Sequence, residues 1–218
     1  MSLGFRIGKH RLGVEAALIE RFRAIPCANI SDAMWRLTAG GAKLRPVGPA
    51  RMIGTALTVR TAPGDNLMVH KAIAMAKPGD VIVVDAGGDL TNAIIGDRMV
   101  TVAAQRGVAG FVINGAIRDR DDLAKHSIPV FAAGVTHRGP YKNGPGEINY
   151  PIAIDGMVIE SGDIVVGDAD GFLSIPFRDA LEVCIGAEAK LAAERDNPPK
   201  SEPEKIDADL RRLGCVFE

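Results

Sequence analysis

The first third of the chain combines a helical spacing of apolar residues with one β-prone segment. Val14, Leu18 and Phe22 recur about every four positions, which is the period of one helix face. The polar run 29–32 supplies N-caps for a second, short helix. These patterns predict helices over 13–24, 29–36 and 66–76, a Pro- and Gly-rich connection over 44–50, and a strand over 54–61.

The middle of the chain alternates strand and helix patterns. Residues 80–84 form a continuous run rich in β-branched side chains, which is typical of a strand covered on both faces. The order strand–helix–strand–helix–strand predicts a partly parallel sheet with right-handed crossovers. The elements expected after the first strand are a helix over 92–105, a strand over 108–113 followed by a turn at Asn114-Gly115, a short helix over 121–125 and a strand over 129–132.

The last third begins with a Gly/Pro loop over 138–146 and continues with short β-prone segments. Their separators are Asp155-Gly156, Ser161-Gly162 and Asp170-Gly171, which favour tight turns between antiparallel strands. The expected strands are 152–154, 157–159, 163–166 and 172–175, and the expected helices are 178–194 and 207–213. We therefore expect an α/β protein with a single domain over residues 1–218. Residues 178–218 would form a C-terminal helical extension that reaches away from the body.

Composition narrows the class of partners. A formal net charge of −1 and an aromatic content of 5% give neither an electrostatic nor a stacking basis for nucleic-acid binding. No apolar run reaches the ~18 residues of a membrane span, and residues 1–11 lack the apolar core of a signal peptide. The cysteines Cys27, Cys184 and Cys215 are too scattered for a disulfide framework or a zinc site. We expect a cytoplasmic protein with no nucleic-acid or membrane partner.

The most informative residues are Asp97, Arg118 and Asp119. Twenty residues separate Asp97 from Arg118, and the predicted helix and strand fill that interval. A carboxylate at the start of a helix and an Arg-Asp pair just past the next strand can converge at one end of the sheet, where open α/β sheets bind ligands. An isolated Arg-Asp pair is more often a surface ion pair or a turn cap than a catalytic pair. The surrounding sequence is therefore needed to distinguish these interpretations.

Eight short motifs supply that context, and their order and spacing are more specific than any one of them. They are Asn29-Ile30-Ser31-Asp32-Ala33, Arg45-Pro46, Gly54-Thr55-Ala56, Pro63-Gly64-Asp65-Asn66, Pro78-Gly79-Asp80-Val81, Gly96-Asp97-Arg98, Asn114-Gly115-Ala116-Ile117-Arg118-Asp119 and Gly162-Asp163-Ile164-Val165-Val166-Gly167-Asp168. Over about residues 25–176 the chain resembles the RraA-like proteins. This family includes the divalent-metal-dependent 4-hydroxy-4-methyl-2-oxoglutarate aldolases and the regulator of ribonuclease activity A.

The resemblance implies a swivelling β/β/α core, assembled as a homotrimer or a dimer of trimers with sites between subunits. It also implies roles for a few residues. Backbone N–H groups of Gly96, Asp97, Arg98 and Met99 would bind the substrate carboxylate, and Arg118 would contact the 2-keto acid and stabilise its enolate. Asp119 would hold Mg²⁺ or Mn²⁺, and Asp97 would orient one of the waters on the metal.

Two further residues bear on this comparison. The family often has Asp where this chain has Asn114, which puts a charged role there in doubt. Glu194, on the penultimate helix, is a candidate for a carboxylate donated to a neighbouring subunit, although a solvated helix face explains it more simply.

The chemistry is consistent with the resemblance. Cleaving a carbon–carbon bond beside a 2-keto acid leaves an enolate, and a hard cation with a fixed guanidinium can carry its charge. We therefore expect a metal-dependent lyase that releases pyruvate from 4-hydroxy-4-methyl-2-oxoglutarate-type acids and decarboxylates oxaloacetate. The alternatives are a non-catalytic regulator that binds ribonuclease E, or a family member acting on another oxo-acid.

Overall fold

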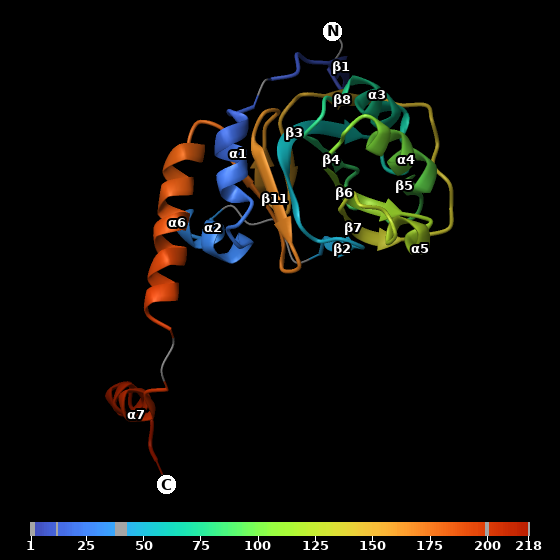
Figure 1. The fold of residues 1–218 in the computed structure, drawn as a ribbon. Coiled ribbons are helices and arrows are strands. Elements are labelled where there is room, and N and C mark those ends of the chain that lie inside the picture. Colours follow the sequence, from blue (N-terminus) through green and yellow to red (C-terminus); the bar gives the residue numbers. More distant parts are fainter. Residues whose placement is uncertain (1–2, 12, 38–42, 199–200, 218) are drawn as a thin grey trace.

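The computed structural model describes residues 3–11, 13–37, 43–198 and 201–217. Within these ranges the chain forms a ten-stranded sheet, a two-stranded ribbon and seven helices (Figure 1). The strands are β1 (Phe5–Ile7), β2 (Arg45–Val47), β3 (Met52–Thr61), β4 (Asp80–Asp85), β5 (Ala93–Ile95), β6 (Gly110–Ile117), β7 (Val130–Val135), β8 (Gly146–Ile148), β9 (Ile152–Ile154), β10 (Met157–Ile159), β11 (Ile164–Asp168) and β12 (Gly171–Ile175). The helices are α1 (Ala16–Phe22), α2 (Cys27–Ala33), α3 (Leu67–Met75), α4 (Asp97–Gln105), α5 (Arg120–Leu123), α6 (Ala180–Asp196) and α7 (Pro203–Arg212).

The centre of the sheet is parallel, as the alternation of patterns predicts. Strands β3, β4, β6 and β7 lie side by side in that order and run in one direction. Antiparallel neighbours flank them, because β8 and β11 pair with β3, and β2 pairs with β7. The carboxyl ends of β4, β6 and β7 therefore lie at one edge of the sheet.

Strand β4 shows why its central residues 81–84 are all apolar. Ile82 and Val84 belong to a core shared with α3 and α4, whereas Val81 and Val83 belong to a second core shared with the β9–β10 ribbon. Successive strand residues point to opposite faces, so a strand covered on both sides needs apolar residues at every position. The sheet is thus enclosed between a helical layer and a second β layer.

A third core joins the N- and C-terminal parts of the chain. Phe22, Ile30 and Cys184, from α1, α2 and α6, pack with residues of β11 and β12 such as Ile164 and Leu173. Figure 1 shows α1, α2 and α6 on the β11 side of the molecule, opposite α3, α4 and α5. Helix α7 lies apart from the body, consistent with the expected break after α6. The expectation that all of 178–218 reaches away is wrong for α6, because its Ala180, Cys184 and Ala187 are buried in this core. Within the described ranges, no helix is long and apolar enough to cross a membrane.

The helix expected over 92–105 is only partly helical. Residues Ala93–Ile95 form β5, which pairs in parallel with β6, and α4 begins at Asp97. Ile94 and Ile95 are buried in the main core. The apolar spacing of 93–95 fits a continuation of α4, but this segment instead pairs with β6 and is buried as a strand. Asp97 therefore lies in the first turn of α4.

The turn expected at Asn114-Gly115 is also wrong, because both residues lie inside β6. A Cβ at Gly115 would stand 3.2 Å from the Ala86 side chain and 3.3 Å from Ile94, so glycine here serves close packing. Asn114 donates a hydrogen bond from Nδ2 to Asp85 Oδ1 at 3.1 Å. Its amide therefore holds the carboxyl end of β4.

Several short elements differ in detail from the expected ones. Helix α2 begins at Cys27 after Pro26, so the polar run 29–32 lies within the helix and does not cap it. The expected connection over 44–50 contains β2, the loop over 138–146 ends in β8, and β1 was not predicted. These strands have three residues each, too few to show a period. Helix α7 begins at 203, earlier than expected, with Pro203 in its first turn.

Asp163 is a buried carboxylate that makes stability depend on pH. Its oxygens accept hydrogen bonds from the backbone N–H groups of Glu160 (2.9 Å) and Phe177 (3.1 Å). Burial nevertheless raises the pKa of Asp163 above its ordinary value. In the pH window between the unfolded and folded pKa values the folded state binds more protons, so this residue's contribution to stability falls as pH rises.

We expect the Asp163→Asn variant to gain stability relative to the wild type as pH rises from 4 to 7. Urea midpoints of both proteins at the two pH values measure this change. Asparagine cannot reproduce every hydrogen bond of the carboxylate, so the variant can be less stable than the wild type at both pH values. The test is whether the midpoint of the variant minus that of the wild type increases from pH 4 to pH 7. A difference that stays constant, or moves the other way, would contradict the raised pKa.

Candidate active site

Two neighbouring strands bring the predicted site residues together. Strand β5 ends at Ile95 and leads into Gly96 and Asp97, while β6 ends at Ile117 and leads into Arg118-Asp119. The strands are parallel and Ile95 is in register with Ile117. The backbone N–H of Arg118 continues the ladder with a 3.0 Å hydrogen bond to the Ile95 carbonyl. The predicted convergence of Asp97 with the Arg-Asp pair is confirmed.

Asp119 lies against the start of α4. Its Oδ2 accepts a hydrogen bond from the Asp97 backbone N–H at 3.1 Å and lies 3.5 Å from Arg118 Nε. Its backbone has a φ of 57°, which is uncommon for a residue other than glycine. Strained backbone of this kind persists where the surrounding structure fixes it, often at functional sites.

Gly96 makes this close approach possible. A Cβ built on Gly96 would stand 2.5 Å from Asp119 Oδ2 and 2.9 Å from the Arg118 side chain, so any larger residue would displace the Arg-Asp pair. The N–H groups in the first turn of a helix have no intrahelical partners and attract anions. The Asp97 N–H already donates to Asp119 and the Met99 N–H to the Gly96 carbonyl at 3.1 Å. The Arg98 N–H, which has no backbone partner in the described chain, is the donor left for an anion beside the Arg118 guanidinium.

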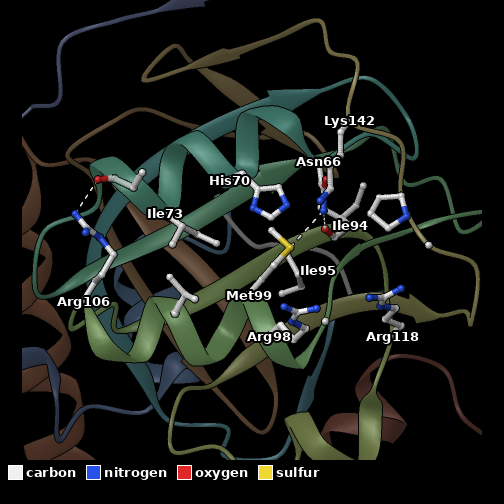
Figure 2. A pocket seen from close by; sticks show the side chains of 15 residues that line it. Asn66, His70, Ile73, Ile94, Ile95, Arg98, Met99, Arg106, Arg118 and Lys142 are labelled. Carbon is white, nitrogen blue, oxygen red and sulfur yellow. Dashed lines mark hydrogen bonds between the residues drawn. The ribbon is translucent and has the colours of Figure 1, made fainter.

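A cavity of about 670 Å³ opens beside these residues (Figure 2). Gly96, Arg98, Met99 and Arg118, which are predicted to bind the substrate, line it, and their binding role stays a prediction. Asp97 and Asp119 are not part of the lining. Each adjoins it, Asp97 as the neighbour of Gly96 and Asp119 through its contact with Arg118.

The lining is strongly basic. In addition to Arg118, it includes Arg98, Arg106, Lys142 and His70, and none of the described lining residues is acidic. Arg106 is tied to the Ala74 carbonyl at 2.7 Å, whereas the side chains of Arg98 and Lys142 have no ion-pair partner in the described part of the chain. Burial, and then the charge of Lys142, lowers the pKa of His70. This composition suits a ligand with more than one negative charge.

The cavity walls are held by hydrogen bonds between distant segments. The Asn66 side chain, only 1% exposed, donates to the Ile94 carbonyl at 2.9 Å and lies 3.3 Å from Met99 Sδ. Asn92 Nδ2 donates to the Gly139 carbonyl at 2.6 Å. A Cβ on Gly139 would lie 3.2 Å from Arg118 Nη1. The loop after β7 is thus fixed close to the guanidinium.

His126 is a site residue that the sequence reading missed. Its Nε2 lies 2.7 Å from Asp97 Oδ1. The histidines show no metal-ligand spacing, and His126 reaches Asp97 only because α5 turns the chain back toward α4. A tertiary contact of this kind leaves no signal in a single sequence.

The residues fit a hard divalent cation that keeps most of its waters. Asp119 Oδ1 has no hydrogen-bond partner among the described residues, and the side chain is 37% exposed. The described ranges contain no group of three or more His, Cys, Asp or Glu residues that could hold a metal. Mg²⁺ is commonly bound by one or two carboxylates plus water and substrate, so a single carboxylate such as that of Asp119 would be compatible with it. The ligand role of Asp119 remains a prediction.

Glu194 has a partner within its own chain. Its Oε2 accepts a hydrogen bond from the buried Asn29 side chain at 2.7 Å, which connects α6 to α2. The predicted contribution of Glu194 to a neighbouring subunit therefore stays a prediction.

Comparison with known proteins gives consistent matches. The family model RraA-like (Aldolase/RraA) matches residues 27–173. A relative from Halalkalibacterium halodurans, provisionally named as a 4-hydroxy-4-methyl-2-oxoglutarate aldolase, is 46% identical over 179 residues, which are 82% of this chain and 85% of the relative. A solved Pseudomonas syringae protein, described as uncharacterized, has a TM-score of 0.76 at 28% identity and covers 85% of this chain and 92% of its own. The RNA-processing inhibitor RraA from Thermus thermophilus has a TM-score of 0.64 at 30% identity, covering 69% and 92%. The predicted fold is confirmed.

Proposed function

We propose that this chain, which belongs to the RraA-like (Aldolase/RraA) family, is a divalent-metal-dependent lyase that releases pyruvate from 2-keto acids. Its substrates would be acids of the 4-hydroxy-4-methyl-2-oxoglutarate type, cleaved by retro-aldol reaction, and oxaloacetate, which it would decarboxylate. The observation that carries the proposal is the Arg118-Asp119 pair, which lies against the first turn of α4 beside a basic cavity.

Substrate binding begins at the start of α4. The carboxylate next to the keto group would bind at the backbone of residues 96–99. The Arg98 N–H is the donor free for it, because the Asp97 N–H is held by Asp119 and the Met99 N–H by the Gly96 carbonyl. The keto oxygen would then face Arg118, whose Nη atoms have no hydrogen-bond partner in the described chain. Because Asp119 Oδ2 lies 3.5 Å from Arg118 Nε, the guanidinium is oriented before the substrate arrives.

The reaction needs a place for an electron pair and a place for a proton. As the bond between C3 and C4 breaks, its electron pair passes into the enolate of pyruvate, which Arg118 stabilises as a charge-assisted donor. The hydroxyl on C4 becomes a carbonyl and its proton passes to Asp97, directly or through one water. Reprotonation at C3 completes the first pyruvate, and the other fragment of 4-hydroxy-4-methyl-2-oxoglutarate is a second pyruvate.

A divalent metal held by Asp119 would supply Lewis-acid polarisation of the keto oxygen. With oxaloacetate, the same enolate forms when CO₂ leaves, so Arg118 performs the same task. This shared step explains why one site would carry out both reactions.

The basic lining suits the second carboxylate of these substrates. Arg98 faces the cavity without an ion-pair partner in the described chain, so its charge is available to a ligand. We expect Arg98→Leu to raise the KM for 4-hydroxy-4-methyl-2-oxoglutarate by about 10-fold, the lower end for a lost hydrogen bond to a charged group. The inhibition constant of pyruvate, which lacks the second carboxylate, should change little.

Arg98→Lys is the matched control, because it keeps the charge and should retain most of the affinity. Steady-state kinetics with pyruvate as product inhibitor measure the KM and the inhibition constant for the wild type and both variants. Equal weakening of dicarboxylate and pyruvate binding in Arg98→Leu would mean that Arg98 does not distinguish them.

The proposal is tested by measuring pyruvate release with lactate dehydrogenase as the coupling enzyme. The expected result is release from both substrates with Mg²⁺ or Mn²⁺ and loss of release with a chelator, restored by excess metal. Two pyruvates should form per 4-hydroxy-4-methyl-2-oxoglutarate and one per oxaloacetate. Folded, metal-supplemented protein that releases no pyruvate from either would overturn it. A stoichiometric complex with ribonuclease E would then favour the regulatory role suggested by the name of the Thermus relative.

A further inference from the structure

The side chain of Asp97 is held by one residue from a different part of the chain. His126, which follows α5, places its Nε2 2.7 Å from Asp97 Oδ1. An ionised carboxylate can only accept hydrogen bonds, so Nε2 carries the proton and donates it. The side chains are 21% and 39% exposed, respectively, which leaves the contact partly shielded from water.

Asp97 is fixed at a second point by its backbone. Its N–H donates to Asp119 Oδ2 at 3.1 Å, while its Oδ2 has no hydrogen-bond partner among the described residues. The nearby cation Lys125 is engaged elsewhere, because its Nζ pairs with Asp122 at 2.8 Å. One oxygen of Asp97 is therefore held by His126, and the other is free for the reaction.

We propose that His126 is a positioning residue that orients Asp97 Oδ2 for proton transfer to and from the substrate. This rests on the proposed function, in which Asp97 receives the proton of the C4 hydroxyl. Asp97 is the first residue of α4 and its carboxylate has free rotation about two bonds. A directional hydrogen bond to Oδ1 restricts that rotation without neutralising Oδ2.

The kinetic test compares His126→Ala and His126→Gln with His137→Gln. His137 is an exposed histidine without a hydrogen-bond partner in the described chain, so it serves as the matched control. Loss of a hydrogen-bond partner that orients a metal ligand typically costs about 10–100-fold in affinity or activity, and we take this range for the partner of an oriented proton acceptor. We expect a loss of about that size in kcat for His126→Ala, with little change in KM. His126→Gln, which can donate through Nε2, should recover most of the rate.

A double-mutant cycle shows whether His126 acts through Asp97. Asp97→Ala with His126→Ala should be no slower than Asp97→Ala alone, because the positioned group is already missing. Independent losses that multiply would overturn the proposal. So would a kcat for His126→Ala equal to that of His137→Gln.

A spectroscopic test does not depend on activity. In ¹⁵N-labelled protein, long-range histidine spectra identify the ring nitrogen that carries the proton, and His126→Gln assigns the signal. The expected result is a protonated Nε2 whose resonance shifts in Asp97→Ala. An Nε2 without a proton, or a resonance unchanged by Asp97→Ala, would overturn the contact. If the wild type releases no pyruvate while this signature is present, the proposed reaction fails and the hydrogen bond stands.

Discussion

Replacing Arg118 with alanine is expected to lower kcat for pyruvate release by about 10²- to 10³-fold, the usual cost of removing one donor to a developing oxyanion. The guanidinium lines the cavity beside the start of α4, and it is held near Asp119 before substrate binds. KM should change less than kcat, because the charge it stabilises is greatest in the transition state. Steady-state kinetics on 4-hydroxy-4-methyl-2-oxoglutarate with saturating Mg²⁺ measure both parameters.

Arg138→Ala is the matched control for this change. Arg138 is exposed on the loop after β7 and does not line the cavity, so its loss removes the same charge from the same region. Circular dichroism should show both variants folded, because the only described side-chain partner of Arg118 is Asp119. Activity of Arg118→Ala equal to that of Arg138→Ala would show that Arg118 does not stabilise the reaction.

Replacing Asp119 with asparagine is expected to have a larger effect. Asparagine tolerates the left-handed backbone found at this position, and its carbonyl can still accept the hydrogen bond from Asp97. The charge that would hold the metal is lost. Since Lewis-acid stabilisation is worth several kcal/mol, kcat/KM should fall by at least about 10³-fold.

Metal binding measured apart from turnover completes that experiment. Titration of Mn²⁺ followed by electron paramagnetic resonance should show clear binding to the wild type and greatly weakened binding to Asp119→Asn. Asp121→Asn, which removes an exposed carboxylate two residues away, should bind Mn²⁺ as the wild type does. Retained Mn²⁺ affinity in Asp119→Asn would remove Asp119 from the metal site, whatever happens to activity.

The sequence predicted the part of the site that lies on consecutive elements. The alternation of strand and helix indicated a parallel sheet, and a parallel sheet brings the ends of β5 and β6 to one edge. Asp97, Arg118 and Asp119 therefore meet where expected, although β5 itself was read as helix. Strand β5 has only three residues and α4 begins two residues after it. Such a short segment shows no period that would distinguish a strand from the first turn of the helix.

The remaining parts of the site depend on contacts between distant segments. Arg98, His70 and Lys142 come from α4, α3 and the loop after β7, and nothing in their local sequence connects them. His126 reaches Asp97 through the turn that follows α5. Asn114 and Gly115 resembled a turn because their residue types favour one, yet packing against Ala86 and Ile94 explains the glycine. In each case tertiary structure decides what the local sequence leaves open.

The central claim is that Arg118 and a metal held by Asp119 stabilise an enolate of pyruvate. Exchange of the pyruvate methyl protons for deuterium in D₂O, followed by ¹H NMR, tests this claim without requiring the natural leaving fragment. We predict Mg²⁺-dependent exchange by the wild type that is largely lost in Arg118→Ala and Asp119→Asn. Exchange no faster than the buffer blank, with folded wild-type protein and saturating Mg²⁺ and pyruvate, would contradict it.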